Sequence, residues 1–171
     1  MHRARFPLAM SLILFGACQA PPSPFTQAQR DSVEAEVREA IEKLTEAMNA
    51  HDPDRVLSFY RESDEFVYVG CTDLMFGWDT FSTLVEPYYS TRTDVTFQRE
   101  TLAIQALDLD AAVVTLRGSS TQAPALFWTQ VLVREDDGRW AIAHEHESWP
   151  GCNDPPPLHP TGAPGEPGDR N

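Results

Sequence analysis

The chain has few basic residues, few cysteines and almost no long apolar run. Its 171 residues include 13 Lys and Arg against 26 Asp and Glu, which gives a formal net charge of −13. A nucleic-acid surface needs a basic patch that neutralises phosphates and releases counterions. The scattered basic residues form no such patch. The composition therefore excludes nucleic acid as a partner, and we interpret the acidity as a feature of a solvated surface.

The sequence also lacks the spacings of several well-defined sites. It contains no Ser-His-Asp or Cys-His arrangement, no phosphate-binding loop and no zinc-finger spacing. His144 and His146 alternate along one predicted strand, but no third ligand can be named beside them. We therefore expect no metal site and no cofactor, and we interpret the two histidines as hydrogen-bonded side chains of a sheet.

The one long apolar run lies at the N-terminus. Residues 6–15 are nearly all apolar, follow a basic start and are too few to span a bilayer, which is typical of a signal peptide. The sequence LFGAC at residues 14–18 resembles a bacterial lipobox. That resemblance implies loss of residues 1–17, a lipid on Cys18 and a location in the cell envelope. Secretion after cleavage near Ala20 and a buried N-terminal helix are the alternatives.

Proline-rich segments flank the region that can fold. Residues 18–30 contain three prolines and are predicted to form an extended spacer. Residues 153–171 contain six prolines and almost no large apolar side chain, so they are predicted to form a disordered tail. The folded domain is therefore expected over residues 31–152. No further segment is apolar enough to span a membrane, so membrane attachment would depend on Cys18 alone.

Three helices are predicted in the first half of the domain. The first has apolar residues at helical spacing and a capping box of Asp31 and Glu34. Its apolar positions are Val33, Val37, Ile41, Leu44 and Met48. Asp52 is predicted to cap a short second helix. Asp79 is predicted to cap a third, which Pro87 should kink or shorten.

Strand patterns occupy the rest of the domain. Two short runs precede the third helix, at residues 66–70 and 74–78. Four longer ones follow it, at residues 95–107, 111–118, 125–134 and 139–149. Residues 136–138, Asp-Asp-Gly, are a strong hairpin signal between the last two strands. This order predicts an α+β fold, with helices gathered on one face of a mostly antiparallel sheet.

The element order and several local motifs resemble the SnoaL-like domains of the nuclear transport factor 2-like superfamily. Residues 49–57 (NAHDPDRVL) resemble the break between the two opening helices, and residues 77–79 (GWD) resemble the turn into the third. Residues 137–148 resemble the closing hairpin and last strand, and also those of the association domain of calcium/calmodulin-dependent protein kinase. The resemblance implies a cone-shaped fold with a pocket and a homodimer. It does not define a function, because this scaffold hosts isomerases, dehydratases, cyclases, ligand binders and assembly modules.

The resemblance also implies a set of pocket residues. It places Arg117 inside the cone with Thr115 on the same strand face, and it turns the Glu147 face of the last strand inward. The expected ligand-pocket residues are Arg117, Thr115, Glu145, Glu147, Tyr60 and Trp78. A buried arginine needs a carboxylate, so we expect Arg117 to meet Glu147 or Glu145 unless it extends to water at a strand edge.

Simple alternation divides the last strand into two faces. One face would carry Ala141, Ala143, Glu145, Glu147 and Trp149. The other would carry Trp140, Ile142, His144, His146 and Ser148.

Two functions from different classes fit the sequence. The sequence favours a non-catalytic module of the envelope that binds an unknown small molecule or assembles with other copies, because no confident acid–base set can be named. The alternative is an isomerase, cyclase or dehydratase with Glu147 or His144 as base and Tyr60 as hydrogen-bond donor. A defined cavity lined by a carboxylate or histidine with a perturbed pKa would favour the enzyme. A shallow pocket filled by Trp or Arg would favour the binder.

The superfamily resemblance implies one disulfide. In this superfamily the first and last strands lie side by side and run parallel, so the residues that follow them should meet. Cys71 follows the first strand and Cys152 follows the last. An exported protein permits the bond, so we predict a Cys71–Cys152 bridge, with two buried thiols as the alternative.

Overall fold

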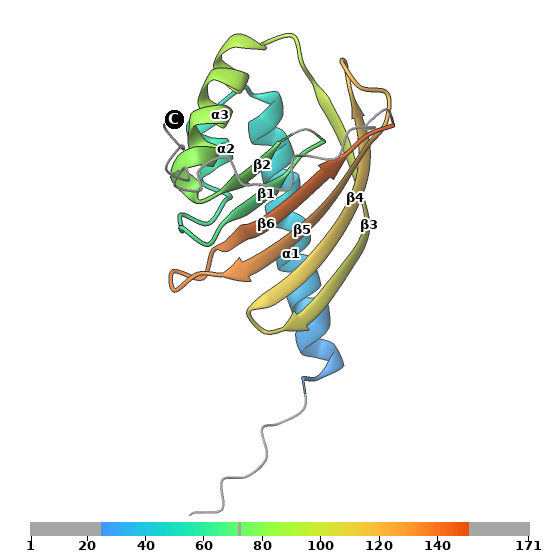
Figure 1. Ribbon diagram of the computed structural model, residues 1–171. Coiled ribbons are helices and arrows are strands. Elements are labelled where there is room, and N and C mark those ends of the chain that lie inside the picture. The colour runs from blue at the N-terminus through green and yellow to red at the C-terminus, as the bar shows by residue number, and fades with distance from the viewer. Residues whose placement is uncertain (1–24, 72, 151–171) are drawn as a thin grey trace, which may run out of the picture.

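The computed structural model describes residues 25–71 and 73–150, which form three helices and a six-stranded sheet (Figure 1). The helices are α1 (Gln27–Asn49), α2 (Pro53–Leu57) and α3 (Trp78–Thr91). The first two strands are β1 (Val67–Val69) and β2 (Leu74–Phe76). The remaining four are β3 (Phe97–Asp108), β4 (Ala111–Ser120), β5 (Leu126–Arg134) and β6 (Trp140–Ser148).

The strands form one sheet in the order β2-β1-β6-β5-β4-β3. Only the β1–β6 pair is parallel, as the resemblance implied, and every other pair is antiparallel. Figure 1 shows the long strands curving around α1, while α2 and α3 gather near the β1–β2 end of the sheet. The predicted α+β fold, with a curved and open sheet, is confirmed.

The first helix begins earlier than the sequence predicted. Its N-cap is Thr26, whose side chain accepts a hydrogen bond from the Gln29 backbone N–H, and the Gln29 side chain bonds back to complete a capping box. Asp31 therefore lies inside the helix, and residues 27–30 belong to α1 and not to an extended spacer. The predicted apolar face is buried as expected, at Val33, Val37, Ile41, Leu44 and Met48.

Of the cap predictions for the other two helices, the one for α2 is confirmed and the one for α3 is wrong. Asp52 caps α2, because its carboxylate accepts the backbone N–H of Arg55 at 3.0 Å. Asp79 does not cap α3. That helix begins at Trp78, after Gly77, whose φ of 81° favours glycine. Pro87 does not shorten α3, which continues to Thr91.

The last strand contains a β-bulge that changes which side chains face inward. Val131 pairs with His144 and Leu132 pairs with Ile142, so Ala143 is an extra residue in β6. The predicted alternation assumed no extra residue, so it assigns the residues of β6 that precede Ala143 to the wrong faces of the sheet. Trp140 and Ile142 share the inner face with Glu145 and Glu147, opposite the buried Leu132, Gln130 and Trp128 of β5.

Several sequence predictions fall outside the described residues. Cys18, the signal segment, most of the spacer and residues 153–171 are not described, so their predicted roles stay predictions. No helix among the described residues is long and apolar enough to cross a membrane. Cys71 is buried, but Cys152 lies outside the described residues, and the Cys71–Cys152 bridge therefore also stays a prediction.

Gly118 in β4 allows the backbone of β3 and the Trp128 ring of β5 to approach β4 closely. A Cβ at this position would lie 2.0 Å from the Gln98 carbonyl oxygen and 3.1 Å from Cζ3 of Trp128. Gly118 is paired with Arg99 of β3 and Leu126 of β5. The missing side chain therefore leaves space for Arg99 and Trp128 to approach one another.

We expect Gly118→Ala to destabilise the domain, because the clash is with backbone that cannot rotate away. Overpacking of this kind costs about 1–3 kcal/mol. Urea denaturation followed by circular dichroism would measure the loss. Ser119→Ala is the control, since it adds no atom to the same strand and should change the free energy of unfolding far less. Equal stability of the two variants would contradict the close approach.

Candidate functional site

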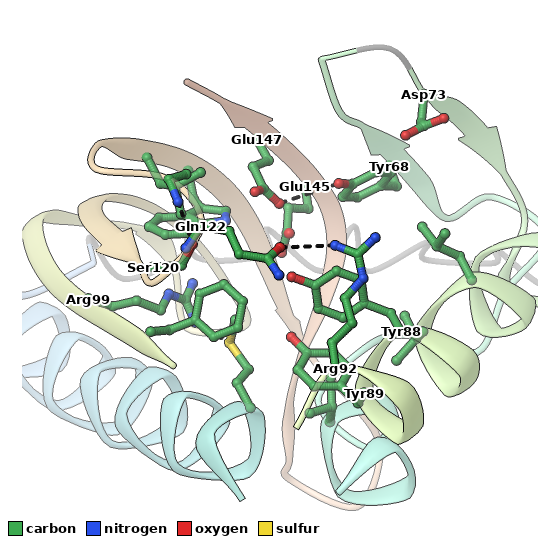
Figure 2. Close-up of a pocket in the computed structure, with 18 of the residues that line it drawn as sticks. Tyr68, Asp73, Tyr88, Tyr89, Arg92, Arg99, Ser120, Gln122, Glu145 and Glu147 are labelled. Atoms are coloured by element: carbon green, nitrogen blue, oxygen red, sulfur yellow. Dashed lines mark hydrogen bonds between the residues drawn. The ribbon is translucent and has the colours of Figure 1, made fainter. Parts of the chain in front are cut away.

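A cavity of about 470 Å³ opens between the inner face of the sheet and α3. Its wall is largely aromatic and apolar, and a small number of charged and hydroxyl groups project from it (Figure 2). This combination is typical of small-molecule sites. The polar groups come from β1, α3, β3, β6 and the loop after β4. They include Tyr68, Tyr88, Tyr89, Arg92, Arg99, Gln122, Glu145 and Glu147.

Glu145 supplies a deeply buried carboxyl group at the cavity floor. Its side chain is 4% exposed, and its Oε2 accepts hydrogen bonds from the Tyr60 hydroxyl at 3.0 Å and from Nε2 of Gln130. Burial raises the pKa of Glu145, while Arg99 and the two donors oppose that rise. Because both donors hold one oxygen of this carboxyl group, Glu145 is fixed in place.

Glu147 lies two residues further along β6 and also lines the cavity. The Tyr68 hydroxyl donates to its Oε2 at 3.3 Å, and the Trp128 indole also stabilises the ionised form. Burial, together with the neighbouring Glu145, raises the pKa of Glu147 to about 7. At neutral pH this carboxyl group is therefore protonated in part of the molecules and ionised in the rest.

Hydroxyl and amide donors from the opposite side complete the polar lining. Figure 2 shows the Tyr88 and Tyr89 side chains directed from α3 into the cavity, facing the two glutamates. Burial raises the pKa of both hydroxyls, so they remain neutral donors. Arg92 at the end of α3 stacks on Tyr88 and donates to the Gln122 side chain at 3.0 Å, which connects α3 to the loop after β4.

Arg99 brings a positive charge into the cavity from β3. Its guanidinium lies 4.9 Å from the ring centroid of Trp128, and its Nη1 donates to the sulfur of Met48 at 3.4 Å. Its Nε is buried and has no hydrogen-bond partner in the structure. Glu100, the next residue, faces the opposite side of the sheet.

The structure separates the residues that the sequence grouped as a pocket. Tyr60, Glu145 and Glu147 line the cavity. Arg117 does not point inward and does not meet either glutamate. It lies on the outer face of β4, where its Nε is 2.7 Å from Glu100 Oε2, and its side chain is 57% exposed. The buried residues of β4 are Ala112, Val114 and Leu116, so strand alternation turns Arg117 outward.

The remaining predicted residues also lie away from the cavity. Thr115 shares the outer face with Arg117. Trp78 opens α3 and packs against Phe81, with ring centroids 6.5 Å apart, but does not line the cavity. His144 pairs with Val131 on the outer face, so the structure does not support it as a base in the cavity. Burial and the nearby His146 lower the pKa of His144.

The arrangement can hold a small molecule and exchange a proton with it. Glu147 has the pKa of a group that both gives and takes protons near neutral pH, and the tyrosines can donate hydrogen bonds to an oxygen on the ligand. Within residues 25–71 and 73–150 there is no cluster of three or more His, Cys, Asp or Glu side chains arranged to hold a metal ion.

The arginines of the cavity and most of its tyrosines were not predicted from the sequence. Arg99 lies two residues after the buried Phe97 in a strand, so period-two alternation would have placed both on the inner face. Tyr88 and Tyr89 read as ordinary apolar positions of a helix. Arg92 and Gln122 carry no sequence signal, because their contact depends on how α3 meets the loop after β4.

Solved structures of varied description share this fold. A ketosteroid isomerase-like protein from Erwinia carotovora atroseptica is 19% identical, with a TM-score of 0.54 over 68% of this chain and 95% of the other. A proposed calcium/calmodulin-dependent protein kinase type II association domain from Thiobacillus denitrificans is 15% identical, with a TM-score of 0.57 over 64% and 91%. A protein from Novosphingobium aromaticivorans, named as a proposed scytalone dehydratase, is 11% identical, with a TM-score of 0.60 over 78% and 97%.

At these identities the likeness shows the fold alone. A comparison with curated protein sequences gave no match. The sequence profile of the SnoaL-like domain, however, matches residues 37–151, which contain α2, α3, all six strands and most of α1. The chain therefore belongs to the SnoaL-like domain family and has the nuclear transport factor 2-like fold.

Proposed function

We propose that the domain is an enzyme that binds a small organic molecule in the cavity and moves a proton on it through the carboxyl group of Glu147. The observation that carries this proposal is a carboxyl group with a pKa of about 7 on the wall of a defined cavity. A general acid–base works best when its pKa lies near the working pH. A carboxyl group with a raised pKa on the wall of a cavity supports an enzyme over a passive binder.

The reaction class that fits is isomerisation or dehydration next to a carbonyl group. In the isomerisation, ionised Glu147 takes a proton from the carbon beside the carbonyl and returns it to another carbon, so no further reactant is needed. Negative charge develops on the carbonyl oxygen during this step. Neutral hydroxyl donors such as Tyr88 and Tyr89, which line the cavity, can stabilise that charge.

Glu145 has a positioning role in this proposal. It is held by Tyr60 and Gln130 and is much less accessible than Glu147. Its carboxyl group raises the pKa of Glu147 by repulsion, which keeps the proton of Glu147 available near neutral pH. Tyr60 therefore supports the acid–base group through Glu145 and does not itself act on the ligand.

The first prediction concerns proton exchange. In buffered D₂O near neutral pH, the wild type should exchange hydrogens beside the carbonyl of small ketones, measured by proton NMR. A suitable panel is cyclohexanone, 2-tetralone and 4-oxo-4-phenylbutanoate. Glu147→Gln should slow the exchange by about 10²–10⁴-fold, the usual contribution of a general base.

Glu100→Gln is the matched control, because it removes a carboxylate from the outer face of the sheet without touching the cavity. It should exchange at the wild-type rate. A different result would support the non-catalytic binding module that the sequence favoured. In that case the ketones would raise the melting temperature of the wild type, but its exchange rate would not exceed that of Glu147→Gln.

The second prediction concerns stability against pH. An unfolded Glu147 loses its proton near its ordinary pKa of 4.5, whereas the folded protein keeps it until about 7. Between these values the folded state binds more protons, so the contribution of Glu147 to stability falls as pH rises. Glu147→Gln should therefore gain stability relative to wild type as the pH rises from about 4.5 to about 7, and the difference should level off above that. Chemical denaturation across this range would show a constant difference if the pKa were ordinary.

We also propose that the domain is exported and held at a membrane by a lipid on Cys18. The support is the sequence of residues 1–18, with a basic start, an apolar run and the lipobox-like LFGAC. The wild type expressed in a bacterium should partition into detergent, and Cys18→Ala should release it or block its processing. Recovery of the wild type wholly in the aqueous phase, with an N-terminus at or beyond Pro21, would rule out the anchor. The expected homodimer stays a prediction.

A further inference from the structure

The cavity contains an arginine without an anionic partner. Five other arginines among the described residues form ion pairs with carboxylates, but none of these pairs includes Arg99. The guanidinium carries five N–H donors. Its Nη1 donates to the Met48 sulfur, a weak acceptor, and its buried Nε has no acceptor. A buried donor without an acceptor is costly, which is a reason to expect an acceptor from outside the chain.

The surroundings of Arg99 hold its guanidinium in place. The group lies over the Trp128 ring at 4.9 Å, and that ring packs against Gly118, the residue paired with Arg99 in β4. Phe97 and Leu126, on the same inner face, add apolar wall beside it. A planar guanidinium supported in this way is suited to bidentate hydrogen bonds with a carboxylate.

The two glutamates of the cavity do not satisfy this charge. Glu145 accepts from Tyr60 and Gln130, and Glu147 accepts from Tyr68, so both carboxyl groups have donors of their own. Neither forms an ion pair with Arg99. Arg99 acts on both only at a distance, because its charge lowers their pKa values while burial raises them. The positive charge of Arg99 therefore remains available to a ligand.

We propose that Arg99 binds the carboxylate of a small organic acid whose apolar part lies against the aromatic wall of the cavity. This inference rests on the proposed function only in that the cavity binds a small molecule. It deepens that function by defining the substrate class as aryl or alkyl acids that carry a second, reactive carbonyl or hydroxyl group. Trp128 contacts both ends of the site, since it packs under Arg99 and stabilises Glu147.

The test compares an acid with its neutral amide. Isothermal titration of the full chain at neutral pH with 4-phenylbutanoate and 4-phenylbutanamide should show the acid binding about tenfold tighter or more. Arg99→Gln should weaken the acid by about tenfold or more and change the affinity for the amide by roughly twofold at most. Arg117→Gln removes the same charge from the outer face and should keep wild-type affinity for the acid.

Two further variants separate the loss of acid binding from misfolding and from the loss of catalysis. Arg99→Lys retains the charge but lacks the planar guanidinium that can form two parallel hydrogen bonds. We expect its affinity for the acid to lie between those of the wild type and Arg99→Gln, and this variant can be tested even if Arg99→Gln does not fold. Glu147→Gln should slow proton exchange by about 10²–10⁴-fold and still bind the acid, so failure of catalysis and failure of acid recognition are separate results. Equal binding of acid and amide, wild-type affinity in both Arg99 variants, or no binding of the acid at millimolar concentration would overturn the inference.

Discussion

The carboxyl group of Glu145 lies where β5, β6 and the chain after α2 meet, and it accepts hydrogen bonds from Gln130 and Tyr60. The same segment is attached to β6 by backbone bonds, from Arg61 N–H to the Ile142 carbonyl and from Ile142 N–H to the Phe59 carbonyl. An acidic group at 4% exposure is tolerated only because it is satisfied in this way. These contacts fix the helical layer against the sheet and thereby set the shape of the cavity floor.

The β-bulge at Ala143 makes this arrangement possible. With strict alternation, Glu145 and Ile142 would face opposite sides, and either the acid or the core residue would be lost from the inner face. The extra residue turns both inward, so one strand supplies hydrophobic core at Trp140 and Ile142 and acidic chemistry at Glu145 and Glu147. Bulges are frequent next to functional sites for this reason.

Most of the fold follows from local signals in the sequence, whereas the site does not. The apolar spacing from Val33 to Met48, the Asp52 cap and the turn ending at Gly138 each have a direct physical cause and occur in the structure. Arg117 was misplaced because a resemblance assigned it to the inner face, although the apolar residues of its own strand predict the outer one. The bulge has no such signal, since it depends on the pairing of β6 with β5.

Arg99 and Glu100 show how the two faces of one strand take on different roles. Glu100 pairs with Arg117 in solvent, where a single ion pair contributes roughly 0–1 kcal/mol to stability. Arg99 lies on the other face, where it is stacked on Trp128 and forms no ion pair with a carboxylate. The lower dielectric there strengthens its attraction to an anion that enters the cavity. These adjacent residues differ in consequence because Glu100 is exposed, whereas Arg99 is half-buried and its Nε is fully buried. In a fold shared by proteins of many descriptions, a half-buried charge that forms no ion pair is stronger evidence of ligand chemistry than the fold itself.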